Sequence, residues 1–474
     1  MPVGRIGAGI LRRYATFVIG FDTDSDYVCD GVDDVIQINQ AIQALPATGG
    51  MIVLRAGTYD VRRSIDLRSG VSLVGEGKEA TVLKLKNSFN QAINIINGSS
   101  ISHVLIRDLT IDGNKNNQGG AGSMVGIKFT NVTYSIISSC RIEDMYWDNS
   151  ISLISSSYNV VEDNELLRPD NSGVGIEYGL YNVVHGNHVE EPGGDGIYLY
   201  STAANRSKHN RIVNNSIHYT GYGGVALYPF SDDNVIEGNL SVECSPGISL
   251  YGLSGQPVRY NLIKGNICRD GDVGIEGAYA QYCTIEANIL EGGYWAEGIS
   301  IWDSEHLIIK GNVVRDNDWG GIELVRCNQC TITGNTCIYN GNGSGIYVAA
   351  PYGAAHVLSN TIVGNTCGLH ERGGIDLRYA DHTSVVGNTC RQNCQYSDNT
   401  RDEIALGDCL YTTVIGNNIL VDGFIRARYG ISESPLGGDT CNYNVVMENV
   451  IRGPASGSFY MHGAGSITGH NVEV

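Results

Sequence analysis

Short runs of alternating apolar and polar residues recur along this chain, separated by turns rich in Gly and Asn. In each unit an apolar pair is followed within a few residues by Asn, as in VVEDN and LIKGN. The closing asparagines are Asn164, Asn187, Asn215, Asn239, Asn266, Asn288, Asn312, Asn335, Asn365, Asn388, Asn417 and Asn449. The shorter intervals between them are 22–24 residues, and the longer ones fit the same unit with an inserted loop. The chain is therefore a repeat, which overrides the several domains that its length would suggest.

A second motif, Gly-Ile-x-Leu or a close variant, runs through the same units. It begins at Gly175, Gly196, Gly224, Gly247, Gly274, Gly298, Gly321, Gly345 and Gly374. Each unit thus holds two or three short strands, and no helical pattern lies between them. This combination predicts an all-β fold, a parallel β-helix or solenoid of about a dozen coils. The coils would stack about 4.8 Å apart, with the asparagines in left-handed conformations at a shared turn and their amides bonded along the stack.

The N-terminal region follows a different pattern. Residues 34–45 predict an amphipathic helix with Asp33 as its N-cap and with one apolar face that comprises Val35, Ile38, Ala41, Ile42 and Leu45. Such a helix would cover the open end of the solenoid and protect its edge from pairing with other chains. We therefore expect an N-terminal segment with a short capping helix over residues 1–60 and the parallel β-helix over residues 61–474. The Gly/Ser-rich segment 453–474 reads either as a degenerate last coil or as a contact segment.

Composition narrows the range of partners. The formal net charge is −19, which argues against a nucleic-acid partner because phosphate binding needs clustered Lys and Arg. No run of 18 apolar residues is present, so we expect no membrane partner. Arg5, Arg12 and Arg13 interrupt the apolar residues of the first twenty positions, and no signal peptide is visible there. We nevertheless expect an extracellular or virion-associated protein. The missing signal does not oppose this, because release of a phage particle by lysis needs no signal.

Thirteen cysteines raise the question of metal or redox chemistry, most of all in the C-x-x-C pair of Cys327 and Cys330. No second close pair and no His pair at zinc spacing accompanies them. Several other cysteines recur at equivalent positions of successive units: Cys268, Cys337, Cys367 and Cys390 each follow a closing Asn by two residues. We therefore interpret most of the cysteines as buried free thiols stacked in columns, and we expect no metal site.

The N-terminal residues resemble a known family. Residues 30–34, DGVDD, the Gln-rich predicted helix, and residues 49–59, GGMIVLRAGTY, are similar to the opening of pectate-lyase-like right-handed β-helix proteins. That superfamily includes polygalacturonases, pectate lyases, alginate epimerases and phage tailspike depolymerases. The resemblance extends over nearly the whole chain through the asparagine-marked coils. It implies a right-handed solenoid, a polysaccharide substrate and, because tailspike proteins are commonly homotrimers, a homotrimer.

The resemblance supplies no catalytic residues. Polygalacturonases carry Asn-Thr-Asp, Gly-His-Gly and Arg-Ile-Lys, pectate lyases carry Arg-x-Pro-x-x-Arg, and alginate epimerases carry Asp-Pro-His. None of these motifs occurs in this sequence. Candidate site residues must therefore come from the strand pattern itself.

In Gly-Ile-x-Leu the Ile and Leu point inward, so x and the residue two positions later point outward. The x column runs Glu177, Tyr198, Ala226, Ser249, Glu276, Ser300, Glu323, Tyr347, Asp376 and Ala405. The second outward column contains Tyr200, Tyr228, Tyr251, Trp302 and Arg378, and Asp303 and Arg326 directly follow strands of this wall. An aromatic column thus leads to a column of carboxylates, which suits a sugar polymer because aromatic faces pack on sugar rings.

Glycosidic bond cleavage needs an acid and a base, commonly two carboxyl groups. The sequence predicts Glu323 as the general acid, with Glu276 or Asp303 activating water and with Asp376 as a further candidate. Glu276 and Glu323 lie two coils apart, about 9–10 Å between backbones, which side-chain tilt could adjust to the spacing of an inverting hydrolase. The predicted substrate-binding residues are Tyr198, Tyr200, Tyr228, Tyr251, Trp302, Arg326, Tyr347 and Arg378. Asp195 and Glu297, each directly before a Gly-Ile pair, are candidates for groups at the rim of the site.

The leading function hypothesis is a glycoside hydrolase that acts on a polysaccharide or oligosaccharide and needs no cofactor. A uronate lyase or C5-epimerase is the first alternative; it would use Tyr198, Tyr347 and Arg378, or Ca²⁺, for proton abstraction and carboxylate neutralisation. A non-catalytic glycan-binding adhesin or phage tail fibre is the second alternative.

Overall fold

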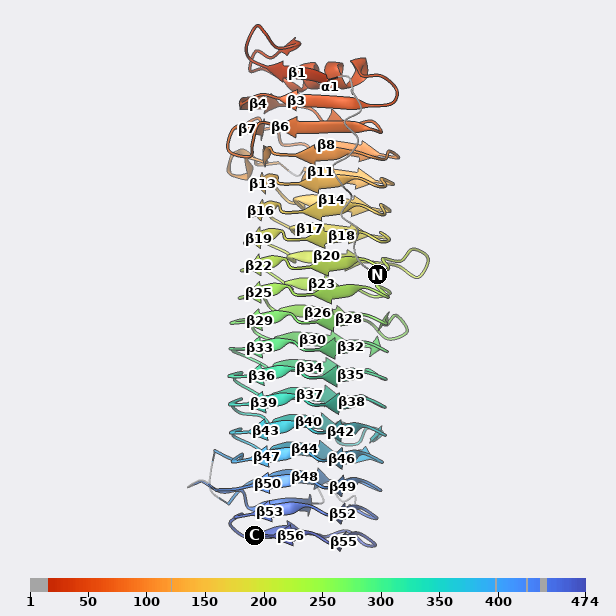
Figure 1. Cartoon of the computed structure of the whole chain (residues 1–474), viewed down its shortest axis with the longest axis vertical. Coiled ribbons are helices and arrows are strands. Elements are labelled where there is room, and N and C mark those ends of the chain that lie inside the picture. Colours follow the sequence, from red (N-terminus) through yellow and green to blue (C-terminus); the bar gives the residue numbers. More distant parts are fainter. Residues whose placement is uncertain (1–15, 121, 397–398, 423–424, 435–440) are drawn as a thin grey trace. The chain divides into compact units, whose positions relative to one another are not determined.

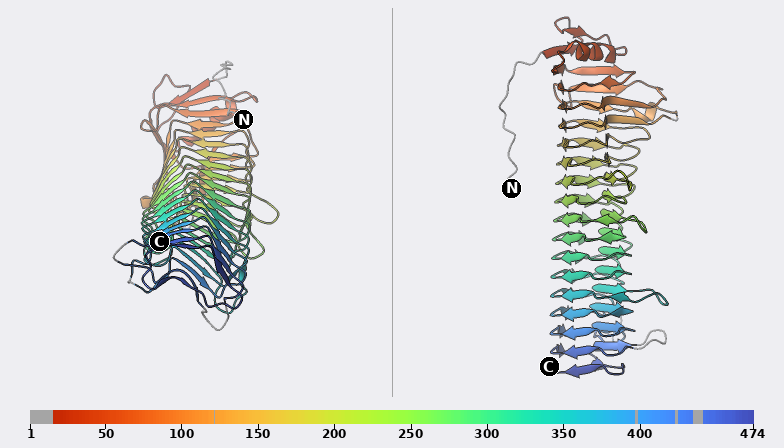
Figure 2. Two further views of the ribbon diagram at one scale, coloured as in Figure 1. Left: turned by 60° about the horizontal axis from the view of Figure 1, so that its bottom comes forward. Right: turned by 90° about the vertical axis from the view of Figure 1, so that its right-hand side faces the viewer.

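A computed structural model describes residues 16–120, 122–396, 399–422, 425–434 and 441–474. By its internal contacts the chain divides into two units, of which the first ends at Asn171 and the second begins at Ser172. Both units are built from short parallel strands that form three sheets, and each strand pairs with the equivalent strand of the neighbouring coil (Figures 1 and 2). The predicted parallel β-helix fold is confirmed.

The first unit contains the helix and the longest strands. Its first sheet contains β1 Thr16–Gly20, β2 Tyr27–Val28, β3 Gly50–Leu54, β6 Val71–Gly75, β9 Leu105–Arg107, β12 Ile136–Ser138 and β15 Val160–Glu162. Its second sheet contains β4 Gly57–Val61, β7 Thr81–Leu85, β10 Thr110–Asp112, β13 Arg141–Glu143 and β16 Glu165–Leu167. Its third sheet contains β5 Ile65–Asp66, β8 Ile93–Ser99, β11 Met124–Thr130 and β14 Ile151–Ile154, and a 3-10 turn covers Lys115–Asn117.

The second unit repeats the same three sheets with shorter strands. Its first sheet contains β18 Val183–His185, β21 Arg211–Val213, β24 Val235–Glu237, β28 Leu262–Lys264, β32 Thr284–Glu286, β35 Ile308–Lys310, β38 Thr331–Thr333, β42 Thr361–Val363, β46 Ser384–Val386, β49 Thr413–Ile415, β52 Val445–Met447 and β55 Ile467–Gly469. Its second sheet contains β19 His188–Glu190, β22 Ser216–His218, β25 Leu240–Val242, β29 Ile267–Arg269, β33 Ile289–Glu291, β36 Val313–Arg315, β39 Thr336–Ile338, β43 Thr366–Gly368, β47 Thr389–Arg391, β50 Asn418–Leu420, β53 Val450–Arg452 and β56 Val472–Glu473.

The third sheet of the second unit carries the predicted site. It contains β17 Val174–Glu177, β20 Ile197–Tyr200, β23 Val225–Leu227, β26 Ile248–Tyr251, β30 Ile275–Ala278, β34 Ile299–Trp302, β37 Ile322–Val325, β40 Ile346–Ala349, β44 Ile375–Arg378, β48 Ile404–Gly407, β51 Tyr429–Ser434 and β54 Gly457–Tyr460. Two small strand pairs complete the unit, β27 Val258–Arg259 with β31 Ala280–Gln281 and β41 Val357–Leu358 with β45 Ala380–Asp381. The prediction of about a dozen coils is too low, because four third-sheet strands of the first unit add to the twelve of the second.

The helix α1 covers Val35–Ala44 and packs against β1 to β5 with the predicted apolar face buried. The prediction of its cap is wrong by one residue. The N-cap position belongs to Asp34, whose carboxylate accepts the backbone N–H groups of Gly31 at 2.9 Å and Asp60 at 2.7 Å. Asp33 has a left-handed backbone (φ 51°) and turns its carboxylate to Arg63. The helix start is therefore fixed by a neighbouring strand and not by a local cap. None of the described helices is long and apolar enough to span a bilayer.

Buried asparagines join successive coils of the second unit. In each step the backbone N–H and the side-chain amide N–H of one Asn both donate to the Oδ1 of the equivalent Asn in the next coil. For Asn312 both bonds to Asn335 measure 2.9 Å, and its amide also donates to the carbonyl of Ile285 at 3.0 Å. The ladder runs through Asn187, Asn215, Asn239, Asn266, Asn288, Asn312, Asn335, Asn365, Asn388, Asn417, Asn449 and Asn471.

The structure corrects one detail of this ladder. The left-handed residue is the one before each ladder Asn, for example Gly311 (φ 63°) before Asn312 and Gly334 (φ 63°) before Asn335. That residue makes the bend, and the Asn after it can then point its amide into the core. This explains why Gly precedes so many of the asparagines, since Gly adopts positive φ without steric cost.

All thirteen cysteines are buried free thiols, which confirms the interpretation made for most of them. Cys337, Cys367 and Cys390 pair directly across β39, β43 and β47 and form one column of the core. Cys330 donates to the carbonyl of Asn328 at 3.3 Å, and burial raises its pKa to about 12. The C-x-x-C pair is therefore part of the packing.

The C-terminal segment forms a last, degenerate coil. Its strands β54, β55 and β56 pair with β51, β52 and β53 in the same parallel register as the coils before them. Of the two interpretations of residues 453–474, the degenerate coil is the one that the structure supports.

Substituting a ladder residue should destabilise the second unit. Asn312→Ala leaves the backbone and side-chain amides of Asn288 and the carbonyl of Ile285 without their buried partner. At roughly 1–3 kcal/mol for each unsatisfied buried group, the unfolding free energy should fall by several kcal/mol. We expect a lower urea midpoint and faster amide hydrogen exchange in the coils around Asn288.

The matched control is Asn205→Ala, which truncates an exposed loop Asn of the same unit. Equal urea midpoints and equal exchange rates for the two variants would contradict the ladder's role.

Candidate functional site

The outward side chains of the third sheet of the second unit, which we term the site face, stand in two columns. Strand pairing aligns Ser249, Glu276, Ser300, Glu323, Tyr347 and Asp376 in the first column. The second column aligns Tyr251, Ala278, Trp302, Val325, Ala349 and Arg378. The predicted register of these residues on one wall is confirmed.

At the first coil of this unit the predicted register is wrong by two residues. The prediction placed Glu177 beside Tyr198, whereas the structure pairs Gly175 with Tyr198 and Glu177 with Tyr200. The cause is a doubled signal, because this coil reads Gly173-Val174-Gly175-Ile176 and its first Gly-apolar pair is the one in register. The ring of Tyr198 lies over Gly175, where a Cβ atom would meet it at 2.5 Å, and its hydroxyl donates to Glu177 at 2.9 Å.

Tyr200, Tyr228 and Tyr251 form a continuous aromatic column. Successive ring centroids are 6.3 and 6.2 Å apart, and the ring planes are inclined by 59° and 67°. Because the rings do not stack flat, parts of their faces stay open, and Tyr200 and Tyr251 are 40% and 47% exposed. Trp302, 39% exposed, continues the column two coils beyond Tyr251.

The aromatic residues at the turns differ from this column. Tyr260, Tyr282 and His306 stack with centroids 5.2 and 4.6 Å apart and planes only 14° and 6° from parallel. Each of those rings covers its neighbour, so the turn stack presents ring edges to solvent. The site face is therefore better suited to hold a sugar ring than the turn stack is.

Tyr228 is held in place by Asp195. Its hydroxyl donates to the Oδ2 of Asp195 at 3.0 Å, and the Oδ1 accepts the backbone N–H of Gly223 at 2.9 Å. Burial raises the pKa of Asp195 to about 6 despite these two hydrogen bonds.

In the middle of the face two carboxyl groups lie close enough for the charge of one to act on the other. Glu323, on β37, is half-buried, and its Oε2 accepts the hydroxyl of Ser300 at 3.1 Å. That hydroxyl oxygen in turn accepts the indole N–H of Trp302 at 3.0 Å. Burial raises the pKa of Glu323. The aromatic column is thus joined to this carboxylate by hydrogen bonds.

Glu297 is the second member of the pair. It directly precedes Gly298, and its side chain lies over Gly320 of the next coil, where a Cβ atom would be 3.2 Å from the Glu297 Cγ. Burial and the negative charge of Glu323 raise the pKa of Glu297 to about 7. Near neutral pH the two groups therefore favour a state with one proton and one negative charge.

The other predicted catalytic residues are placed differently. Glu276 is on the same wall but is exposed, and within the described part of the chain it makes no hydrogen bond or ion pair. Asp303 is held by the guanidinium of Arg326, with Nη2 2.6 Å from Oδ2, and Asp376 by Arg378, with Nη2 2.8 Å from Oδ2. Because a guanidinium group already occupies each of these carboxylates, we do not retain Asp303 and Asp376 as acid or base.

The two arginines also cover aromatic residues. Arg326 lies over the ring of Trp302 at 5.3 Å from its centroid, and Arg378 lies over Tyr347 at the same distance. Their first role in the structure is therefore to hold these rings. Burial raises the pKa of Tyr347, which keeps its phenol protonated.

Sequence reasoning gave Glu297 only a place at the rim. Its coil position, directly before the Gly-Ile pair, is the position that Asp195 and Asp402 occupy in other coils. The sequence signal that could have identified Glu297 as a site residue is an acidic residue at that position with a glycine beside it in the following coil. What raises its pKa, burial first and then the charge of Glu323, depends on side-chain geometry and could not be read from the spacing.

Residues 65–240 match the family model described as right handed beta helix region. The chain has the right-handed parallel β-helix fold. The resemblance seen in the sequence is thereby confirmed, including the handedness that the strand pattern alone did not give.

A second family model, periplasmic copper-binding protein (NosD), matches residues 205–320 and 230–393. Over these matched ranges, all of which the structure describes, the side chains do not fit a copper site. Among the described residues, no three His, Cys, Asp or Glu side chains form a group that could hold a metal ion.

Among curated proteins, a mannuronan C5-epimerase of Azotobacter vinelandii is 38% identical over 104 residues, which is 19% of this chain and 19% of that protein. A cell surface glycoprotein of Methanothermus fervidus is 26% identical over 122 residues, 24% of this chain and 20% of that protein. The matched regions thus span a fifth or less of these relatives.

Two solved structures share the fold. The bacteriophage phi29 gene product 12 aligns with a TM-score of 0.58 at 13% identity, over 94% of this chain and 71% of that chain. A periplasmic alginate epimerase, AlgG, aligns with a TM-score of 0.51 at 14% identity, over 71% of this chain and 78% of that chain.

The raised pKa of Glu297 should be visible in stability. The folded state favours neutral Glu297, so its contribution is fully present below the ordinary Glu pKa and is lost as pH rises through about 7. Glu297→Gln removes this titration. The melting temperature of the native protein relative to this variant should therefore fall between about pH 5 and about pH 8.

Glu286→Gln is the control for this measurement. Lys310 lowers the pKa of Glu286, so that residue stays ionised in both folded and unfolded chains across the same range. Its difference in melting temperature should be flat with pH. A flat difference for Glu297→Gln as well would contradict the raised pKa.

Proposed function

We propose that this β-helix protein hydrolyses a glycan on the site face, with Glu297 as the general acid and Glu323 as the base that activates water. The observation that carries the proposal is the pairing of two half-buried carboxyl groups beside Trp302, one of which holds its proton to about pH 7. Two carboxyl groups with separated pKa values are the usual equipment for cleaving a glycosidic bond.

The roles follow from the environments of the two groups. Glu297 accepts no hydrogen bond from another side chain in the described structure, and the charge of Glu323 opposes its ionisation, so it is the group that keeps a proton. Glu323 accepts the Ser300 hydroxyl, which favours its charged form. Glu297 would protonate the glycosidic oxygen, and Glu323 would take a proton from the attacking water. This reverses the role that the sequence suggested for Glu323.

Substrate would lie along the aromatic column. Tyr251 and Trp302 flank the coil of Glu276, and their open ring faces suit the C–H faces of sugar rings. Glu276 is then a substrate contact, because its exposed carboxylate can accept sugar hydroxyls. Tyr200 and Tyr228 would extend the binding surface on the side of Asp195.

Uronate epimerisation or elimination is the second candidate, favoured by the segment that is 38% identical to a mannuronan C5-epimerase. That chemistry needs a base at C5. Among the tyrosines proposed for it, Tyr198 donates its hydroxyl to Glu177, and the pKa of Tyr347 is raised by burial. The hydroxyl of Tyr198 is thus already engaged and the phenol of Tyr347 stays protonated, which is why we place hydrolysis first.

The remaining expectations stay proposals. We propose an extracellular, envelope or virion location, in keeping with a cell surface glycoprotein and a periplasmic epimerase among the similar proteins. A homotrimer is the assembly that the resemblance implies, and sedimentation equilibrium of the full chain measures it. Hydrolysis as proposed needs no cofactor, whereas the lyase alternative would call for Ca²⁺.

The decisive experiment is a polysaccharide panel with mass analysis of the products, with and without a chelator. Hydrolysis gives new reducing ends with one water added, elimination gives an unsaturated uronate that absorbs in the ultraviolet, and epimerisation changes residues without chain cleavage. On the glycan that is cleaved, Glu297→Gln and Glu323→Gln should each lower kcat by roughly 10²–10⁴-fold, the usual contribution of a general acid or base.

Glu286→Gln, on the first sheet, should keep the full rate. Undiminished release of reducing ends by both Glu297→Gln and Glu323→Gln would refute the mechanism. If the protein binds a glycan but none of these three kinds of product is detected, the adhesin alternative remains.

The pH dependence of the cleavage gives an independent check. Glu297 must be protonated to act as the acid, so kcat/KM should fall as pH rises above about 7. The cleavage of an activated aryl glycoside, whose leaving group needs no protonation, should lose this alkaline limb. An alkaline limb of the same pKa on both substrates would argue against Glu297 as the acid.

A further inference from the structure

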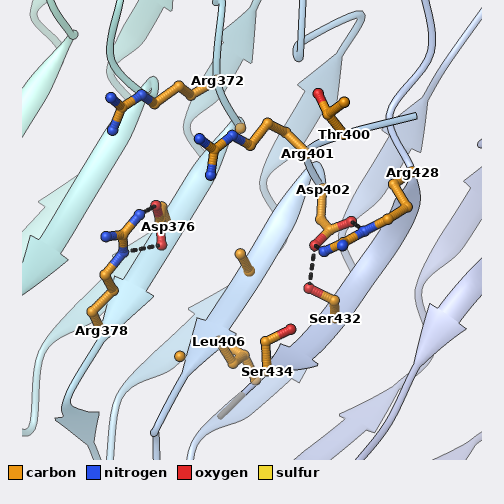
Figure 3. A pocket seen from close by; sticks show the side chains of 13 residues that line it. Arg372, Asp376, Arg378, Thr400, Arg401, Asp402, Leu406, Arg428, Ser432 and Ser434 are labelled. Atoms are coloured by element: carbon orange, nitrogen blue, oxygen red, sulfur yellow. Dashed lines mark hydrogen bonds and ion pairs between the residues drawn. The ribbon is translucent and has the colours of Figure 1, made fainter. Parts of the chain in front are cut away.

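A pocket lies further along the site face, beyond the carboxyl pair. Its walls come from the coils of β44, β48 and β51, and none of its lining residues belongs to the pair. The lining residues are Arg372, Gly373, Asp376, Arg378, Thr400, Arg401, Asp402, Ala405, Leu406, Gly407, Arg428, Ser432 and Ser434 (Figure 3).

Both carboxylates of the pocket are already neutralised. Asp402, 6% exposed, accepts Arg428 Nη2 at 2.7 Å, Arg428 Nε at 3.0 Å, the Ser432 hydroxyl at 2.6 Å and the backbone N–H of Tyr429 at 3.0 Å. Asp376 is paired with Arg378. Each of these acids is therefore occupied by a partner inside the protein.

Two further guanidinium groups have no such partner. Arg372 and Arg401 are exposed, and neither makes an ion pair within the described part of the chain. In Figure 3 the side chain of Arg401 extends toward the strand of Asp376, while Arg428 is turned to Asp402. Four arginines against two aspartates leave the lining with a net charge of +2, in a chain whose formal charge is −19.

We propose that this pocket binds an oxyanion substituent, a carboxylate or a sulfate ester, carried by the glycan on the site face. Guanidinium groups bind such planar or tetrahedral oxyanions through paired N–H donors. Ser434, which is half-buried, adds a hydroxyl group to the lining for a neighbouring sugar oxygen. The proposal rests on the proposed function in taking a glycan as the ligand.

The spacing fits one extended chain. Asp376 stands two coils from Glu323, and Ser432 stands four coils from it, so the pocket lies about 10–19 Å from the carboxyl pair along the face. Tyr347, under Arg378, bridges the interval. A glycan bound at Trp302 would therefore reach the pocket, and its acidic group would set the position of the bond over Glu297.

The test compares charged and neutral probes of equal length. Binding of an oligomannuronate, its carboxyl-reduced neutral counterpart, a sulfated dextran oligosaccharide and the parent dextran is measured by calorimetry. The protein carries Glu323→Gln throughout, so that turnover does not interfere. We expect at least one charged probe to bind about tenfold more tightly than its neutral counterpart, and added salt to remove the difference.

Arg372→Gln with Arg401→Gln should abolish that preference and leave neutral probes unchanged. The control pair is Arg211→Gln with Arg315→Gln, which removes the same charge from the first and second sheets. Ala405→Asp, which places a carboxylate on the pocket floor, should also abolish the preference, and its isosteric control Ala405→Asn should keep it. These variants touch exposed positions or the outward column, and unchanged melting temperatures would verify folding.

A carboxylate preference identifies an acidic sugar, and a sulfate preference identifies a sulfate ester; either supports the pocket. Equal affinity for charged and neutral probes, or a preference that survives Arg372→Gln with Arg401→Gln, overturns it. Failure of the catalytic proposal has a different signature, because the glycan panel would then show no hydrolysis while the charge preference persists.

Discussion

The buried asparagine ladder is the interaction on which the rest of the second unit depends. A turn inside a solenoid leaves backbone groups with no strand partner, and in the core no water can satisfy them. Each ladder Asn takes up two N–H donors of the preceding coil on one oxygen and returns its own amide to a carbonyl of the coil before and to the next oxygen. A slip of one residue would expose the amide and leave its hydrogen-bond partners unsatisfied, so the ladder fixes the register as strictly as the apolar core does.

Fixed register turns a repeat into columns, and columns bring like charges together. Two carboxylates one coil apart would repel by about 3 kcal/mol at an effective dielectric constant of about 20. The first column of the site face avoids this, because uncharged Ser300 and Tyr347 separate Glu276, Glu323 and Asp376. The other sheets use opposite charges, as between Lys310 and Glu286. Glu297 and Glu323 depart from this arrangement, and burial together with the charge of Glu323 raises the pKa of Glu297.

The site face therefore combines two electrostatic environments on one surface. Around Trp302 the two carboxyl groups are half-buried and one of them keeps its proton, which suits proton transfer. Around Arg372 and Arg401 the charge is positive and unpaired, which suits an anion. A solenoid can hold such different environments a few coils apart, because each coil contacts its neighbours and little else.

The sequence by itself determined the coil, the ladder, the stacked cysteines and the outward columns, because each depends on a period of two within a strand or on the repeat along the chain. It also placed Tyr251, Glu276, Trp302 and Glu323 on one wall. It misjudged the helix cap, the first coil with its doubled Gly-apolar signal, and the number of coils, whose N-terminal members lack the closing Asn. Only the tertiary structure decided which carboxyl groups interact with each other and which are paired with arginines. Glu297 and Glu323 belong to the first group, and Asp303 and Asp376 belong to the second. Those outcomes depend on side-chain direction across coils 20 or more residues apart, and a repeat fixes the height of a side chain on the wall but not the neighbour toward which it turns.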